Sequence, residues 1–153
     1  MTRSALWIQS RLGRATERLR LSSRNLQVRC RGRQQPTALA SSMYPFDKLP
    51  LQTTNDAEFR AVLKGKLATG ESLEVHETTL PAGGAPHPPH HHVHSEMWLV
   101  REGTVEITVN GTRHRLGPGS VGFVHSNDEH GIRNLSSTPA TYFVVAIGPG
   151  ADS

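Results

Sequence analysis

The sequence lacks features that several classes of protein need. No stretch approaches the roughly 20 apolar residues of a membrane helix, which excludes a transmembrane span. The single cysteine, Cys30, excludes a disulfide framework and a metal site built from cysteines. No G-x-S-x-G sequence is present, so serine-nucleophile chemistry of the hydrolase type has no support.

Acidic residues are nearly absent from the first part of the chain. Residues 1–42 hold nine arginines against one acid, Glu17, a formal charge of +8. Residues 43–153 hold eight basic and twelve acidic residues, a formal charge of −4. The net charge of +4 therefore belongs to a basic extension, 1–42, and the domain over 43–153 is mildly acidic. Because its charge is negative, we expect this domain to have no nucleic-acid partner.

Three interpretations of the basic extension stay open. Its composition fits a disordered tail, or translated sequence upstream of a start at Met43. It also fits an organellar transit peptide, whereas the lack of an apolar region before Ala38-Leu39-Ala40 weakens a secretory signal. A basic arm touching nucleic acid or an anionic membrane is the third interpretation, without interleaved aromatic residues to support it. We expect a cytoplasmic location unless residues 1–42 are a cleaved leader for an organelle or for export.

Alternating hydrophobicity predicts short strands after Met43. Alternate residues of 104–109 are apolar, Asn110-Gly111 is a strong hairpin signal, and 112–116 is the expected return strand. Further strands are predicted over 60–67, 72–79, 96–100, 121–124 and 141–147. Those over 96–100 and 141–147 are apolar on both faces, so we expect them to be buried on both sides.

Short strands at close spacing, separated by glycine and proline, predict an all-β antiparallel sandwich or barrel. A domain of about 110 residues buries only about 60–65% of the surface of its unfolded chain. A barrel of this size often gains from dimerisation, although the sequence does not show an interface.

The histidines are concentrated in one segment, where five of nine fall within eight residues. His90 and His92 are two apart, so on an extended chain both project to one face, where neutral imidazoles can share a metal ion. Glu96 has the same parity, but a straight strand would place it about 13 Å from His92, at roughly 3.3 Å per residue. A shared site therefore requires a bend over residues 93–95. His130 is the leading candidate for a fourth ligand.

These residues resemble two motifs of the cupin superfamily. The first, G-x5-H-x-H-x3-E-x6-G, is matched in full by Gly84, His90, His92, Glu96 and Gly103. The second, G-x5-P-x-G-x2-H-x3-N, is matched at Gly119, His130 and Asn134, with His125 in place of the proline and Asn127 in place of the glycine. The resemblance covers about residues 71–147. The two substitutions concern the loop before His130 and leave the ligands in place.

The resemblance implies a double-stranded β-helix, which is the jelly-roll barrel of this family. It also implies one divalent metal ion inside the barrel, bound by His90, His92, Glu96 and His130. Small cupins of this type commonly form dimers, so a homodimer is expected. The spacing of Glu96 and the second motif argue against an exposed histidine-rich loop with adventitious metal affinity.

Four other histidines lie outside the expected set of ligands. His91 has the opposite parity to its neighbours and is expected to face solvent. His94 lies at the bend, where we expect a contact with the ligands or with solvent rather than ligation. His125 is either a base near the metal ion or an exposed or structural histidine, and the role of His87 is open. The aromatic residues that either line a cavity or pack in the core are Trp98, Phe123 and Tyr142.

Three imidazoles and one carboxylate form a mixed set of ligands that suits iron, manganese, nickel, copper or zinc. A six-coordinate ion would keep two positions for water, dioxygen or a chelating substrate, whereas the shell of a tetrahedral zinc would be full.

Two classes of function follow. One is a metal-dependent enzyme of the dioxygenase or isomerase type that acts on a small polar molecule. The other is a cupin that binds or senses a metal ion and a small ligand without turnover. The sequence reveals no second acid–base pair.

Overall fold

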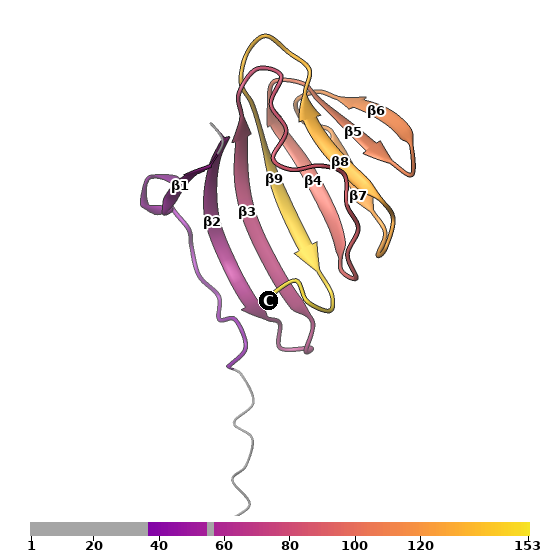
Figure 1. Cartoon of the computed structure of the whole chain (residues 1–153). Helices are drawn as coiled ribbons and strands as arrows, with labels where there is room; N and C mark the ends of the chain where they lie inside the picture. The colour runs from indigo at the N-terminus through magenta and orange to yellow at the C-terminus, as the bar shows by residue number, and fades with distance from the viewer. Residues whose placement is uncertain (1–36, 55–56) are drawn as a thin grey trace, which may run out of the picture. The chain divides into compact units, whose positions relative to one another are not determined.

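Residues 37–54 and 57–153 are described by a computed structural model of the chain (Figure 1). Residues 1–36 lie outside that description, and with them most of the basic extension and its predicted targeting, tail or binding roles. Within the described part, no helix combines the length and the hydrophobicity needed to cross a membrane. The division of the chain between residues 42 and 43 stays a prediction.

Nine strands and one short 3₁₀ helix form from the described residues. In chain order they are η1 (Phe46–Lys48), β1 (Leu51–Thr54), β2 (Ala57–Lys66), β3 (Ser72–Leu80), β4 (Ser95–Glu102), β5 (Val105–Val109), β6 (Thr112–Leu116), β7 (Val121–Val124), β8 (His130–Asn134) and β9 (Ala140–Ile147). Each strand predicted from hydrophobic alternation is present. The sequence pattern does not predict β1 or β8, which are short and mixed in composition.

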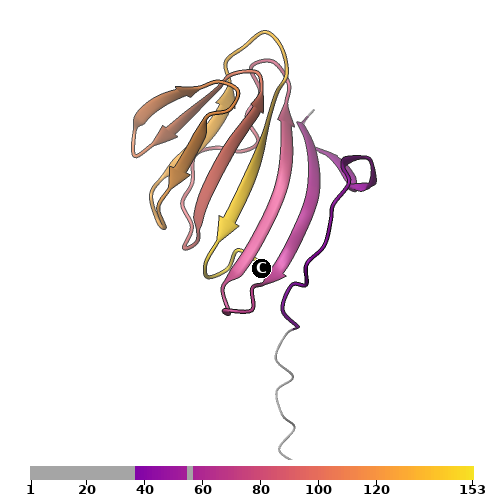
Figure 2. The same cartoon turned by 180° about the vertical axis from the view of Figure 1, so that it is seen from behind.

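The strands pair into two antiparallel sheets (Figures 1 and 2). The larger sheet has the order β1-β2-β3-β9-β4-β7, and the smaller one has the order β6-β5-β8. Strand β9 completes the larger sheet by pairing with both β3 and β4, which lie far from it in sequence. Buried apolar side chains from the two sheets form one core, which includes Leu80, Trp98, Val105, Ile107 and Ile132. The predicted all-β jelly-roll architecture is confirmed.

The Asn110-Gly111 hairpin forms as predicted. Strands β5 and β6 pair Val109 with Thr112, which leaves a loop of two residues. The φ angles are +47° at Asn110 and +80° at Gly111, so both residues adopt the left-handed conformation of a type I′ turn. This local turn fixes the register of the smaller sheet.

The expectation that residues 96–100 are buried on both sides is wrong for β4. Trp98 and Val100 are buried inside the barrel, whereas Met97 and Leu99 on the outer face remain 38% and 36% exposed. On β9 the same expectation agrees with residues 141–146, which are buried or half-buried, whereas Ile147 at its end is 40% exposed. An antiparallel sheet normally presents polar residues on its solvent face. The outer face of the larger sheet is instead apolar at these positions in the single chain.

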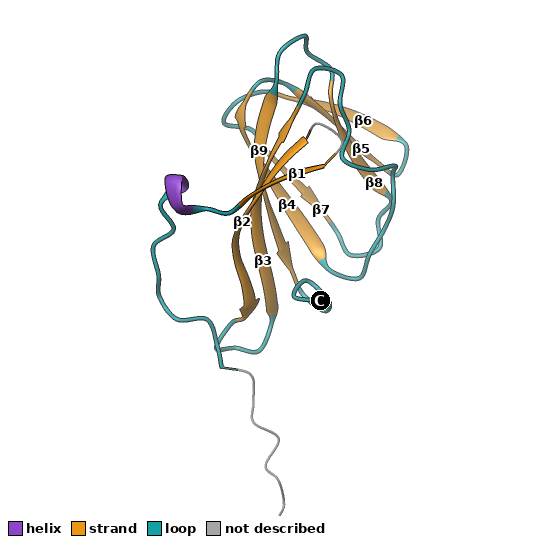
Figure 3. Ribbon diagram, turned by 60° about the vertical axis from the view of Figure 1, so that its left-hand side comes forward, coloured by secondary structure: helices purple, strands orange, loops and turns teal. Residues whose placement is uncertain are grey.

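Strand β3 carries a buried carboxylate. Figure 3 shows the short helix η1 at the β1–β2 end of the larger sheet. Glu77 of β3 is only 1% exposed, and its Oε2 accepts a hydrogen bond of 3.0 Å from Nη1 of Arg101. Nη1 of Arg60 lies 3.9 Å from its Oε1. The ring of Phe46 lies 4.8 Å from the guanidinium carbon of Arg60 and 5.2 Å from that of Arg101. The aromatic ring therefore covers a paired charge, a favourable place for arginine.

Candidate metal centre

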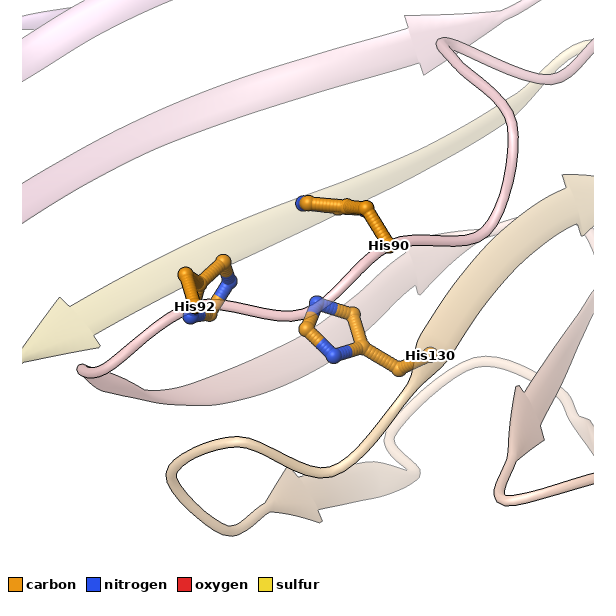
Figure 4. A group of neighbouring side chains, drawn as sticks. All are labelled: His90, His92 and His130. Carbon is orange, nitrogen blue, oxygen red and sulfur yellow. The ribbon is translucent and has the colours of Figure 1, made fainter.

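The loop that precedes β4 pairs with the start of β8. His90 and His130 exchange two backbone hydrogen bonds, of 2.9 and 2.8 Å. Pro89 lies so close to Gly131 that a Cβ on the glycine would be 3.2 Å from the proline ring. The absent side chain therefore permits the close approach of loop and strand. Figure 4 shows the rings of His90, His92 and His130 gathered around one space.

The chain bends between His92 and Glu96, as a shared site requires. The backbone N–H of Asn127 holds the bend by donating to the carbonyl oxygen of His92 at 2.8 Å. Beyond the bend, Oε1 of Glu96 lies 3.1 Å from Nε2 of His92, and Oε2 lies 3.7 Å from Nε2 of His130. The structure thus brings together the four predicted ligands His90, His92, Glu96 and His130. Their binding of a metal ion stays a prediction.

Hydrogen bonds determine which ring nitrogens are free. Nδ1 of His92 lies 2.9 Å from the carbonyl oxygen of His94, and Nδ1 of His130 lies 2.8 Å from that of Asp128. Because a carbonyl oxygen only accepts, Nδ1 carries the proton in the neutral form of both rings, and Nε2 then keeps a lone pair. Those two Nε2 atoms and Nδ1 of His90 are buried without a hydrogen-bond partner. Unpaired buried nitrogens are unfavourable unless something binds them.

The geometry of the three histidines fits a divalent cation. One ring nitrogen from each of His90, His92 and His130 lies within 4.8 Å of the others. Burial lowers the pKa of His90, and the neighbouring histidines lower it further, while Glu96 offsets part of that effect. The ring of His90 is therefore neutral at pH 7, which is the form that binds metal ions.

A turn forms in the loop before His130, where the proline and the glycine of the motif are replaced. Asn127 stands at the glycine position with a φ of +65°. Asparagine is one of the few residues besides glycine that adopt this left-handed conformation readily. The backbone N–H of Asp128 then donates to the carbonyl oxygen of His125 at 3.1 Å and closes a turn. The asparagine thus supplies the conformation that the glycine would supply.

A cavity of about 390 Å³ lies beside the histidine cluster. Glu96 and His130 form part of its wall, and Phe59 and Trp98 contribute apolar surface. None of the described residues that line it is a lysine or an arginine. A bound anion would therefore find its counter-charge at the metal centre rather than on a basic side chain.

The aromatic residues singled out from the sequence separate into two groups. Trp98 and Tyr142 both line the cavity and belong to the core, with exposed fractions of 2% and 1%. Burial raises the pKa of Tyr142, so its hydroxyl keeps the proton beside its cross-strand neighbour Thr78. Phe123 lies on the outer face, 61% exposed, and has no place in the cavity wall.

An acid–base pair on β3 was not predicted from the sequence. His76 lines the cavity, and its Nδ1 lies 3.4 Å from Oε1 of Glu74. Its ring packs against Phe59 at a centroid distance of 4.5 Å. Burial lowers the pKa of His76, and Glu74 and Glu96 offset part of that effect. The two residues are two apart on a strand outside both motifs. The spacing of the motifs therefore does not relate them to the metal ligands.

His87, His91 and His125 are exposed, whereas His94 is half-buried. His91 faces solvent, as its parity indicates. His87 is exposed at the cavity wall, where its ring meets that of His90 edge to face at a centroid distance of 4.3 Å. His125 is an exposed loop residue whose Nδ1 lies 2.8 Å from the carbonyl oxygen of Ser126. This environment favours the exposed alternative for His125 over a base near the metal ion.

Comparison with known proteins gives matches to one family. Residues 76–146 match the family model described as Cupin domain. L-ectoine synthase from Bordetella petrii is 36% identical over 63 residues, which is 40% of this chain and 47% of the relative. The chain therefore spans less than half the length of that curated relative.

Solved structures share the architecture. KdgF from Halomonas sp. aligns with a TM-score of 0.60 and 18% identity, over 70% of this chain and 94% of that one. A predicted oxalate decarboxylase from Thermotoga maritima aligns with a TM-score of 0.60 and 17% identity, over 70% of this chain and 99% of that one. At these identities the likeness shows the fold alone.

Proposed function

Residues 76–146 are a cupin domain, and we propose on this premise that the chain is a metal-dependent enzyme acting on a small polar molecule. The proposed ligands of one divalent ion are His90, His92, Glu96 and His130. One observation carries the proposal: three histidines turn buried, unpaired ring nitrogens toward one another beside a cavity. The ion is iron, manganese, nickel, copper or zinc, since all of these accept imidazole and carboxylate ligands.

Such an ion supplies Lewis acidity when bound, and a redox-active one also supports chemistry with dioxygen. The chain's own part is to hold and orient the ligands. The carbonyl oxygens of His94 and Asp128 fix the ring orientation of His92 and His130, the kind of support that raises ligand basicity. On the cavity wall, His76 is available to accept a proton from a bound molecule. Dioxygenase or isomerase chemistry is the leading type for this arrangement.

The cavity favours a particular class of ligand. Its volume of about 390 Å³ falls within the range of small-molecule sites. Hydrogen-bonding groups reach it from Thr78, His76 and Tyr142, and the rings of Phe59 and Trp98 add apolar surface. Because neither lysine nor arginine is present among the described lining residues, we favour a ligand with at most one negative charge that chelates the ion through oxygen or nitrogen.

The curated relative supports the proposal of an enzyme and suggests a first reaction to assay. It carries the name of a synthase, and its match of 63 residues falls on part of this chain only. We therefore include the reaction of L-ectoine synthase in the substrate panel, together with oxygen-dependent reactions of small hydroxy and keto compounds.

A cupin that binds or senses a ligand without turnover is the second candidate. The observation that favours this second candidate is that four potential metal ligands lie together at the site. Four protein ligands complete the shell of a tetrahedral zinc ion and would leave no open position for a substrate.

Metal analysis of the full chain, purified without a histidine tag, tests the site. We expect about one equivalent of metal in the wild type and in His91→Ala, and little in His92→Ala, because metal ligands act as a set. His91 is the matched control, since it is an exposed neighbour in the same loop. Stoichiometric metal in His92→Ala would refute the ligand assignment. A wild type without metal after reconstitution would refute metal binding.

Turnover separates the two candidates. Substrate-dependent oxygen uptake or isomerisation that disappears in Glu96→Ala would support the enzyme. Tight ligand binding with no turnover across the panel would support the binding or sensing role.

We also propose that the chain forms a homodimer. The support is the apolar outer face of the larger sheet, where Met97, Leu99 and Phe123 are exposed in the single chain.

A further inference from the structure

A fifth side chain lies within reach of the proposed metal centre. The ring of His94 stacks on that of His92, with centroids 3.6 Å apart and 15° between the planes. Nε2 of His94 lies 3.6 Å from Oε1 of Glu96. Ligand atoms of His92, His94 and Glu96 all lie within 4.8 Å of one another, as do those of His90, His92 and His130. The site therefore contains two groups of three potential ligands that share His92.

The two groups differ in chemistry. The first offers three imidazoles, and the second offers two imidazoles and a carboxylate, the combination used by many non-haem iron sites. Glu96 lies between them, since its Oε1 is 3.1 Å from Nε2 of His92 and its Oε2 is 3.7 Å from Nε2 of His130. The carboxylate can thus support an ion on either side.

His92 cannot serve both groups at the same time. Its Nδ1 donates to the carbonyl oxygen of His94, so only Nε2 has a lone pair for a metal ion. One imidazole nitrogen binds one ion. The two groups are therefore alternatives, and the site holds a single ion.

We propose that His94 is an alternative metal ligand, which holds the ion together with His92 and Glu96 when the group of three histidines is weakened. This inference rests on the proposed function, because both positions belong to the same metal centre. The position held by His90, His92 and His130 is the main one, since their unpaired nitrogens are buried. The position that includes His94 is the minor one in the wild type and becomes the main one when His90 is lost.

Zinc titration of the metal-free full chain by calorimetry tests this role. The variants are His94→Ala, His90→Ala and the double variant, with His91→Ala added to each background as the matched control. We expect the dissociation constant of His94→Ala to stay within about threefold of the wild type. In contrast, we expect the double variant to bind at least about tenfold more weakly than His90→Ala, because even partners outside the metal shell change affinity by about 10- to 100-fold.

The coordination itself has a second readout. In ¹⁵N spectra of zinc-loaded His90→Ala, the Nε2 resonance of His94 should move to the position of a metal-bound nitrogen. His90 is a partly exposed loop residue, so we expect the variant to fold. If circular dichroism shows that it does not, His90→Asn provides the same background for both measurements.

The possible failures are distinguishable. A wild type that binds no zinc refutes the proposed metal centre. Tight binding by the wild type, with equal dissociation constants for His90→Ala and the double variant, leaves the metal centre intact and overturns the role of His94. An unchanged His94 resonance in zinc-loaded His90→Ala overturns it as well.

Discussion

At the scale of single residues, the turn between β4 and β5 depends on one glycine. Gly103 has a φ of +74°, and a Cβ there would lie 2.7 Å from both the Cα of Ala140 and the carbonyl oxygen of Pro139. We expect Gly103→Ala to lower the free energy of unfolding by about 2–4 kcal/mol, because left-handed strain and overpacking act together. Urea denaturation measures this loss.

Gly111 provides the matched control for that substitution. Its φ is +80°, and nothing lies within 4 Å of the place where a Cβ would be. Gly111→Ala therefore introduces the conformational strain alone, about 1–2 kcal/mol. Equal losses in the two variants would contradict the close contact of Gly103 with the segment before β9.

His76 makes stability depend on pH. Burial lowers its pKa in the folded chain, so between the folded and unfolded values the unfolded chain binds more protons. The stability that neutral His76 contributes is therefore fully present above the unfolded pKa of about 6.5, and it is lost as the pH falls below that value. We expect the unfolding free energy of the metal-free chain to decline between pH 7 and pH 5, with a smaller slope in His76→Gln.

The pKa values of the half-buried His90 and His94 are also lowered, so part of the slope should remain in His76→Gln. Chemical denaturation of both chains at a series of pH values makes the comparison. Identical slopes would show that protonation of His76 does not differ between the folded and unfolded chains.

Much of the candidate site was accessible from the sequence because its residues lie in two short motifs. Their spacing identified four side chains that the structure brings together, and parity indicated correctly that His91 faces solvent. The spacing said nothing of His76 and its neighbour Glu74, since His76 reaches the cavity through the pairing of β3 with β9. The spacing also did not predict that His94 stacks on His92. Alternation of side chains applies to an extended strand, and His94 lies at a bend.

At the scale of elements, one side chain holds the connection from β8 to β9 against the end of β3. Asn134 is fully buried, and its Nδ2 donates to the carbonyl oxygens of Leu80, Pro81 and Thr138 at 3.3, 3.0 and 2.7 Å. Its Oδ1 accepts from N–H and O–H of Ser136 at 2.9 and 2.6 Å. The last residue of the second motif thus ties together three segments of the barrel.

Replacing Asn134 by leucine should cost about 2–4 kcal/mol of unfolding free energy, because several buried carbonyl and N–H groups lose their partner at once. Ser136→Ala, which removes a single hydroxyl from the same network, should cost about 0.5–1.5 kcal/mol. Thermal or urea unfolding distinguishes the two. A leucine variant as stable as the wild type would show that the network does not support this end of the barrel.

The elements themselves were predictable where local signals decide them. Hydrophobic alternation and the Asn110-Gly111 turn specify the β5–β6 hairpin without reference to the rest of the chain. Strand β8 was not predictable in that way, because its residues become a strand through pairing with β5 and with the loop at His90. The sequence also could not tell whether the second apolar face of β4 is covered within one chain or between chains.

At the scale of the whole molecule, the apolar outer face of the larger sheet is a candidate interface. The exposed apolar residues of β4, β7 and β9 are Met97, Leu99, Val121, Phe123 and Ile147, with exposed fractions of 38, 36, 56, 61 and 40%. Met97 pairs with Phe123 and Leu99 with Val121, so the side chains are contiguous across two strands. None of them is charged, so a second copy would meet no like charge there. A contiguous apolar face of this kind typically marks an interface.

A second copy can cover this face in a symmetric dimer, because each chain presents the same surface to the other. Phe123→Lys should then yield a monomer, since two lysines would be buried in an apolar interface without partners. The fold should persist, because the side chain is already 61% exposed. Thr112→Lys adds the same charge at an exposed position of β6 and should leave the dimer intact. Sedimentation velocity decides between 16.8 kDa and twice that mass. A monomeric wild type would refute the dimer, and a dimeric Phe123→Lys would exclude this face as its interface.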